Sequence, residues 1–277
     1  MLVSTRWVYD NINNPEVRIL EVSEDEHLYD EWHIPNALKL SWKDELRSKE
    51  WRDFINKTEF EELMSKKGIS NTTKVVLYGD KSNWFACNGY WLFKYYGHPF
   101  VYIMDGGRKK WEIENLPKSK EVPIFNEARY IAKQRDETIR AYLWEIKRAL
   151  AENRKDFILV DIRSPMEYSG EINSILPEEG AYIGGHIPGA VNIPWNENIN
   201  DKDWTFKSRD ELLKLYESKG VTRDKEVITY CRIGERSALT WFVIKEILNY
   251  PRVKNYDGSW TEWGNSVRTR IKRGYEP

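Results

Sequence analysis

A cysteine stands where a buried strand is expected to run into a helix, and its neighbours suit nucleophilic chemistry. Residues 230–237 read YCRIGERS, with Cys231 directly after the strand. The unpaired N–H groups of such a loop point at the cysteine, and Arg232 and Arg236 add positive charge, so the thiolate is favoured over the thiol. Gly234 allows the backbone to curl until successive N–H groups converge on one anion. The sequence therefore predicts that Cys231 is a nucleophile in an anion-binding loop.

The remaining thiol and two loop residues have less specific interpretations. Cys87 lies in an aromatic, helix-like run and is expected to be a small buried hydrophobe, the usual fate of a free cysteine. Ser237 either caps the helix that follows or takes part in the site. Arg236 is expected to point inward, because it ends the loop.

The sequence contains the same unit twice. The motif HIPNA at residues 33–37 returns as HIPGA at residues 186–190, and residues 74–111 align with residues 226–263 without a gap. A repeat of more than about one hundred residues is too long for a solenoid and indicates a duplicated domain. In this alignment Gly79 stands opposite Cys231, so only the second half has a thiol after its strand.

Each half alternates strand-like and helix-like segments. Short, almost wholly apolar runs suit strands buried on both faces of a parallel sheet. These runs are residues 19–22, 75–78, 158–161 and 227–230, and the clearest helical segments are residues 137–152, 209–219 and 238–249. The alternation predicts an α/β fold, a doubly wound parallel sheet flanked by helices in each of two tandem domains. We expect a non-catalytic first domain over residues 1–116, a linker over 117–135 and a catalytic second domain over 136–277.

A second cation lies at another expected strand end. Arg163 follows the run at residues 158–161, and α/β sheets usually place ligands at such ends. Its counterpart in the first half is Ser23, so this cation, like the thiol, belongs to the second half alone. Contact with a substrate and a structural salt bridge are both compatible with this position.

Composition limits the partners and the compartment. The chain has 43 basic and 44 acidic residues, so no excess of positive charge is available for nucleic acid. No run approaches the roughly 18 apolar residues that span a bilayer, and no secretory signal is expected. Two cysteines make a disulfide framework improbable and favour a reducing, cytoplasmic setting. Neither a metal nor an organic cofactor is expected, since no clustered Cys/His ligand set occurs. The oligomeric state is not indicated.

The motifs carry a family resemblance. The loop at residues 231–237 resembles the active-site loop of the rhodanese family, and the duplication resembles its two-domain thiosulfate sulfurtransferases. Residues 182–192 (YIGGHIPGAVN) and 253–263 (VKNYDGSWTEW) resemble two further motifs of the family, and the resemblance covers essentially the whole chain. It implies a five-stranded parallel sheet in each half and a first domain that has lost its cysteine. It also implies that His33 and His186 are structural.

The resemblance implies a sulfur transfer in two steps. Attack of Cys231 on the outer sulfur of thiosulfate would give a cysteine persulfide and release sulfite, and cyanide or a thiol would then accept the sulfur. The residues expected to bind the anionic donor are Arg232, Ile233, Gly234, Glu235, Arg236, Ser237 and Arg163. Vertebrate members carry a lysine where this chain has Ile233 and an arginine near Glu167. Arg236 either replaces these two missing contacts or pairs with Glu167 and braces the loop.

Three alternatives remain open. A 3-mercaptopyruvate sulfurtransferase usually has a small residue directly after the cysteine, where this chain has Arg232. A phosphatase of the dual-specificity cell-cycle type has five residues between its cysteine and arginine, and here four separate Cys231 from Arg236. A sulfur-relay protein with a protein acceptor is compatible with the intact cysteine.

Overall fold

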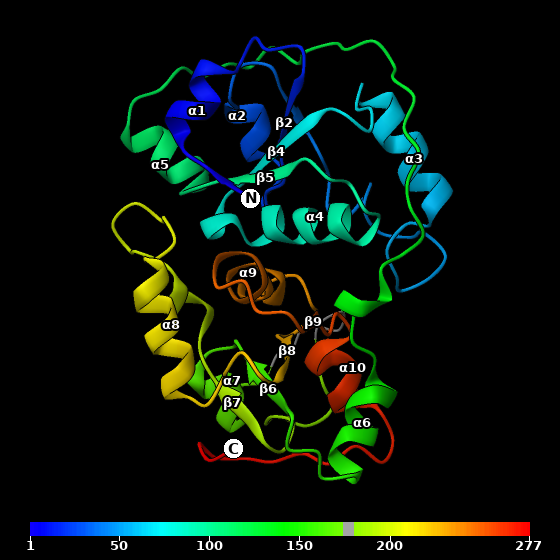
Figure 1. Cartoon of the computed structure of the whole chain (residues 1–277), viewed down its shortest axis with the longest axis vertical. Coiled ribbons are helices and arrows are strands. Elements are labelled where there is room, and N and C mark those ends of the chain that lie inside the picture. Colours follow the sequence, from blue (N-terminus) through cyan, green and yellow to red (C-terminus); the bar gives the residue numbers. More distant parts are fainter. Residues whose placement is uncertain (174–179) are drawn as a thin grey trace. The chain divides into compact units, whose positions relative to one another are not determined.

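The computed structural model describes residues 1–173 and 180–277 and divides the chain into two compact units (Figure 1). One unit comprises Met1–Asp136 with Asn200–Phe206, and the other Glu137–Ile199 with Lys207–Pro277. The segment predicted as a linker is therefore counted with the first unit, as is a short excursion from the second half of the sequence.

The first unit is a doubly wound sheet of five parallel strands in the order β1-β5-β4-β2-β3. Its strands are β1 (Leu2–Val3), β2 (Val17–Glu21), β3 (Ala37–Lys39), β4 (Lys74–Tyr78) and β5 (Val101–Met104). Its helices are α1 (Thr5–Asp10), α2 (Leu28–Glu31), α3 (Lys57–Lys66), η1 (Lys81–Asn83), α4 (Trp84–Tyr95) and α5 (Gly107–Ile113). One face of the sheet shares a core with α1 and α5, and α4 packs against β4 and β5.

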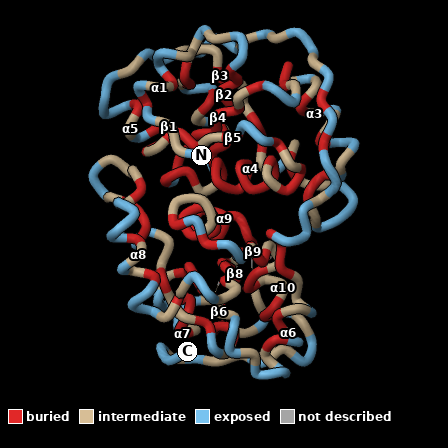
Figure 2. The backbone as a smooth tube through the Cα atoms, viewed as in Figure 1, coloured by how far each residue is buried: buried red, intermediate tan, exposed pale blue. Residues whose placement is uncertain are grey.

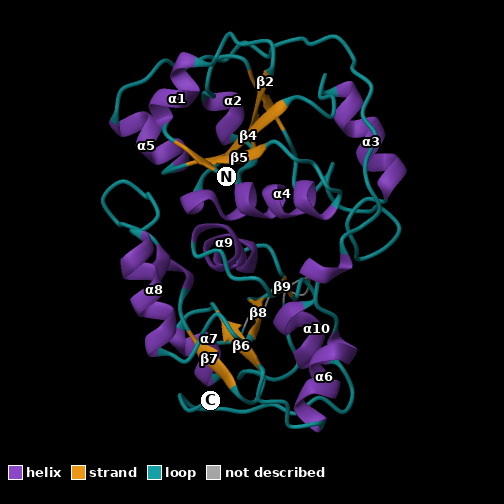
Figure 3. Cartoon of the chain, viewed as in Figure 1, coloured by secondary structure: helices purple, strands orange, loops and turns teal. Residues whose placement is uncertain are grey.

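The second unit repeats this plan with four parallel strands in the order β7-β6-β8-β9. Its strands are β6 (Phe157–Asp161), β7 (Ala190–Asn192), β8 (Glu226–Tyr230) and β9 (Val253–Asn255). Its helices are η2 (Glu137–Ile139), α6 (Leu143–Ala151), α7 (Pro165–Ser169), η3 (Trp195–Asn198), α8 (Arg209–Ser218), α9 (Ser237–Phe242), the π-helical turn η4 (Val243–Ile247) and α10 (Ser259–Asn265). The central strands of both units are buried, as Figure 2 shows, and helices flank both sheets (Figure 3). The predicted fold class is confirmed.

The second sheet differs from the five strands that the family resemblance implies. Within the described residues it has four strands, and the place next to β9 is taken by a single parallel bridge between Arg140 and Asn255. The N–H of Ala141 donates to the carbonyl of Asn255 at 3.0 Å. The turn η2 ends at Ile139 and α6 begins at Leu143, which leaves too little extended chain for a strand. The helix predicted over residues 137–152 is split into η2 and α6, because residues 140–142 between them are not helical.

A histidine stacked on a tyrosine recurs in both units. The ring of His33 lies 3.9 Å from that of Tyr29, and the ring of His186 lies 3.6 Å from that of Tyr168, both nearly parallel. Each histidine Nδ1 donates to the carbonyl of its own tyrosine, at 2.9 and 2.8 Å. Both histidines are fully buried, so the structural role implied for them agrees with their contacts.

Each unit also buries a carboxylate at the end of an equivalent strand. Glu21, at the end of β2, accepts from Nη1 of Arg108 at 2.8 and 2.9 Å, and the Arg108 guanidinium lies 3.7 Å from the centre of the Trp32 ring. Burial raises the pKa of Glu21, while Arg108 opposes that shift. In the second unit Asp161, at the end of β6, pairs with Arg163 at 2.6 Å. A buried carboxylate of this kind depends on its cation.

We expect Arg108→Met to lower the unfolding free energy of the first unit by about 3–5 kcal/mol, because it leaves the Glu21 carboxylate buried without its cation. Denaturant unfolding followed by tryptophan fluorescence measures the loss. The double variant Glu21→Gln with Arg108→Met should recover part of it, since no charge is then left buried. Arg6→Met, which breaks an exposed pair with Asp10, is the control and should change little. Equal stability of the two single variants would contradict the assignment.

Candidate active site

The chain leaving β8 curls around the sulfur of Cys231. The side chain of Cys231 is buried, and its Sγ accepts a hydrogen bond from the N–H of Gly234 at 3.1 Å. The N–H of Cys231 donates to Oγ of Ser259 at 3.1 Å, and its carbonyl accepts from the N–H of Trp260 at 3.1 Å. The backbone on both sides of the thiol is thus held by the segment that follows β9. An N–H group directed at a sulfur stabilises negative charge on it.

The curl of the loop requires a glycine. Gly234 has φ of 101°, and a Cβ built there would lie 2.4 Å from Cα of Asp257. Asp257 is itself fixed by Arg140, with Nε to Oδ1 and Nη2 to Oδ2 both at 3.0 Å. The loop therefore lies directly against the backbone of Asp257. An ordinary side chain at residue 234 would meet both a steric clash and an unfavourable backbone angle.

Ser237 and Asn255 hold the far end of the loop. Oγ of Ser237 donates to the carbonyl of Gly234 at 2.9 Å and lies 2.6 Å from Oδ1 of Asn255. Nδ2 of Asn255 donates to the same carbonyl at 3.0 Å. The N-cap of α9 is Arg236, without a side-chain cap bond, so Ser237 does not cap that helix. Both side chains are fully buried, and their contacts support the shape of the loop.

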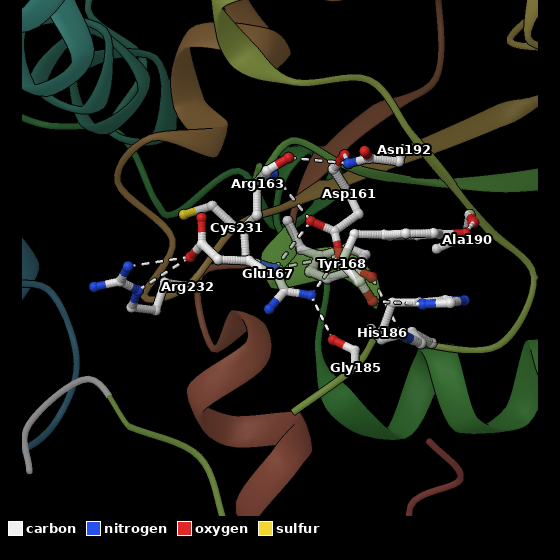
Figure 4. A network of polar contacts seen from close by, with 12 residues as sticks. Asp161, Arg163, Glu167, Tyr168, Gly185, His186, Ala190, Asn192, Cys231 and Arg232 are labelled. Carbon is white, nitrogen blue, oxygen red and sulfur yellow. Dashed lines mark hydrogen bonds and ion pairs between the residues drawn. The ribbon is translucent and has the colours of Figure 1, made fainter. Parts of the chain in front are cut away.

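Two loop arginines meet one carboxylate, as Figure 4 shows for Arg232 and Glu167. Oε1 of Glu167 lies 3.1 Å from Nη2 of Arg232 and 3.3 Å from Nη2 of Arg236. Burial favours the neutral form of Glu167, but Arg236, Arg163 and Arg232 outweigh it and lower its pKa to about 2. Glu167 is therefore ionised at neutral pH. Of the two roles considered for Arg236, the pairing with Glu167 is the one that its contacts show.

The other predicted substrate-binding residues lie in two different settings. Ile233 is half-buried and Glu235 buried within the loop, and their part in donor binding stays a prediction. Arg163 is buried beneath the loop, where its Nη2 donates to Oδ2 of Asp161 at 2.6 Å and to the carbonyl of Gly185 at 2.7 Å (Figure 4). These bonds favour the structural salt bridge over contact with a substrate.

Sequence reasoning missed Asn255, Ser259 and Asp257 as residues that shape the site. All three follow or end β9, some twenty residues or more along the chain from the cysteine. The motif at residues 253–263 marked this segment, but only the pairing of β8 with β9 shows that it touches the loop.

The equivalent loop of the first unit is filled by its own side chains. Oδ1 of Asn83 accepts from the N–H of Gly79 at 2.9 Å, and its Nδ2 donates to the carbonyl of Met104 at 2.9 Å. The carboxylate of Asp80 accepts from the N–H groups of Glu24 and Asp25. A Cβ at Gly79 would lie 2.1 Å from the carbonyl oxygen of Val22. This loop has no thiol, and the Asn83 side chain occupies the N–H of the residue that stands opposite Cys231.

Residues 1–173 and 180–277 hold no group of three or more His, Cys, Asp or Glu side chains placed to bind a metal ion. In the same residues no helix has both the length and the apolar character needed to cross a membrane.

Comparison with known proteins matches both halves. The model of the rhodanese-like domain family matches residues 4–114 and 145–266. The sulfur carrier protein TtuD of Thermus thermophilus is 51% identical over 279 residues, which cover 100% of this chain and 98% of that protein. A protein of Saccharopolyspora erythraea named "Putative thiosulfate sulfurtransferase" is 48% identical, over 100% of this chain and 97% of its own. A solved structure of an EanB variant with a cysteine persulfide and ergothioneine has 26% identity and a TM-score of 0.84, over 99% of this chain and 70% of that one.

We expect Gly234→Ala to slow sulfur loading of Cys231 by roughly a hundredfold, because the loop must move off Asp257 and withdraw its N–H from the sulfur. The rate of mass gain on incubation with a sulfur donor measures the effect. Gly189→Ala is the control, since Gly189 has φ of 83° but nothing within 4 Å of its built Cβ. That variant bears the backbone strain alone. Similar loading rates for the two variants would show that the contact with Asp257 does not shape the loop.

Proposed function

Because the chain belongs to the rhodanese family, with two rhodanese-like domains and full-length sulfurtransferase relatives, we propose that it transfers the outer sulfur of thiosulfate through a persulfide on Cys231. The observation that carries this proposal is the thiol itself. Its sulfur faces the Gly234 N–H inside a loop that also bears Arg232 and Arg236. Such a loop suits a thiolate nucleophile and an anionic donor.

The first step breaks the sulfur–sulfur bond of the donor. The Cys231 thiolate attacks the outer sulfur of thiosulfate, the new bond makes a persulfide, and the electron pair of the broken bond leaves on sulfite. A thiolate of charge −1 and a dianion give a persulfide anion of charge −1 and sulfite of charge −2, so no oxidant or proton is needed. In the second step cyanide or a thiolate takes the outer sulfur and Cys231 returns to the thiolate. The covalent intermediate divides one transfer into two easier ones.

Thiosulfate is favoured over 3-mercaptopyruvate by the residue after the cysteine and by the names of relatives. Arg232 stands where the mercaptopyruvate branch usually has a small residue. Relatives 47–48% identical over nearly the full chain bear the name "Putative thiosulfate sulfurtransferase". The phosphatase alternative receives no support, since four residues separate Cys231 from Arg236 and make a smaller ring than that chemistry uses.

A protein acceptor is the second candidate for the sulfur that leaves Cys231. The relative in Thermus thermophilus, 51% identical, is named as a sulfur carrier protein. In a carrier the same persulfide forms, and the acceptor is a thiol or another nucleophile on a partner protein. The cytoplasmic setting expected from the free cysteines is part of this proposal, because reduced acceptors are abundant there.

We expect wild-type protein treated with thiosulfate to gain the mass of one sulfur, and cyanide to remove it. Cys231→Ser should gain none, while its unfolding curve stays close to that of the wild type. Intact-mass spectrometry measures both. Cys87→Ser is the matched control, because that thiol is buried in α4 and burial raises its pKa, and it should load normally. A gain of sulfur by the Cys231→Ser protein would contradict the assignment of Cys231 as the sulfur-carrying residue.

Arg232→Ala and Arg236→Ala should each lower kcat/KM with thiosulfate, by an amount equivalent to about 2.7–4 kcal/mol if the arginine stabilises the transition state. Sulfite release under steady-state conditions measures the loss. Arg252→Ala removes an exposed cation at the opposite end of β9 and is expected to leave turnover intact. If both loop variants kept the wild-type value, the loop arginines would not be the anion site.

A further inference from the structure

Glu167 offsets part of the positive charge that the Cys231 loop presents to a dianionic donor. Arg163 is paired with Asp161, and Arg140 with Asp257, so neither pair contributes net charge. The two loop arginines, Arg232 and Arg236, share Oε1 of Glu167, so this one carboxylate offsets part of the positive charge of both. The step with thiosulfate gathers three negative charges here, one from the thiolate and two from the donor.

Glu167 is built into this position by its helix. It occupies the third position of α7, where its Oε2 accepts from the N–H and the hydroxyl of Ser164 at 3.2 and 3.1 Å. This capping box directs the other oxygen, Oε1, at the two arginines. The guanidinium groups of Arg232 and Arg236 are only partly buried, at 26% and 15% side-chain exposure, so an incoming anion reaches the same groups that Glu167 holds.

We propose that Glu167 is a specificity-determining residue, which offsets one loop arginine and so reduces the advantage that the loop arginines give a dianionic sulfur donor over a monoanionic one. The repulsion between Glu167 and a donor grows with the charge of the donor, so a dianion experiences it about twice as strongly as a monoanion. The carboxylate stays charged over the whole neutral range, because its pKa is held at about 2. This inference rests on the proposed function and refines its donor class.

A pair of donors that differ by one charge tests the inference. Thiosulfate and methanethiosulfonate present the same sulfur–sulfur bond, but the second carries a methyl group in place of one anionic oxygen. The rate constant of persulfide formation on Cys231 is measured for each donor in single-turnover experiments by intact mass, with wild-type protein and Glu167→Gln. We expect the variant to raise the ratio of the thiosulfate rate constant to the methanethiosulfonate rate constant about tenfold at low ionic strength. Added salt should shrink this change.

The chain offers a matched control for the substitution. Glu211 occupies the same position in the capping box of α8, where its Oε2 accepts from the N–H of Ser208 at 3.0 Å, but it is exposed and contacts no loop arginine. Glu211→Gln should leave the donor ratio at the wild-type value. Thermal unfolding of both variants checks that the substitution preserves the fold.

The outcomes distinguish failure of the inference about Glu167 from failure of the proposed sulfur transfer. An unchanged donor ratio in Glu167→Gln, or equal losses of rate with both donors, would mean that Glu167 only braces the loop, and the inference would be overturned. If neither donor placed sulfur on the wild-type Cys231, the proposed function would fail, and the inference with it.

Discussion

The second unit depends on one close approach, in which the backbone of Gly234 lies against the backbone of Asp257. The parallel pairing of β8 with β9 brings two strand ends together, and the chain leaving β9 becomes the surface on which the chain leaving β8 curls. Hydrogen bonds from that surface fix both sides of Cys231. Because the curl turns the Gly234 N–H toward the sulfur, a packing constraint sets the environment of the thiol.

The two halves show which parts of this frame the fold requires. Both place a buried carboxylate at the end of the equivalent strand, β2 or β6, and both neutralise it with an arginine. The arginine comes from α5 in the first unit, as Arg108, and from two residues beyond the carboxylate in the second, as Arg163. Ser23, the positional counterpart of Arg163, donates to Glu21 at 3.0 Å. The requirement is therefore for a paired charge, and the position that supplies the cation has changed between the halves.

The sequence predicted the features that depend on local pattern. The repeat, the central strands and the placement of Cys231 after β8 follow from apolar runs and motif spacing, and α8 ends one residue before its predicted end, with Gly220 at φ of 74°. Contacts between distant segments could not be read in this way. Asn255 supports the loop only because β9 lies beside β8, and Arg163 is of a residue type that serves a salt bridge and an anion site equally well. The missing fifth strand of the second sheet depends on how early α6 begins, which a smooth helical pattern does not disclose.

The filled loop of the first unit bears on how a duplicated domain keeps or loses a chemical role. A cysteine introduced at Gly79 would need its Cβ where the carbonyl oxygen of Val22 already lies, and Asn83 has taken the N–H of Gly79. Lys81 and Asn83 also have left-handed backbone angles, which Ile233 and Glu235 at the equivalent positions of the Cys231 loop do not. A cysteine at residue 79 alone would therefore not return a working thiol to this half. Once such a loop has repacked around its own side chains, the loss of the thiol becomes hard to reverse. Later sequence change is then free to adapt that half to other tasks.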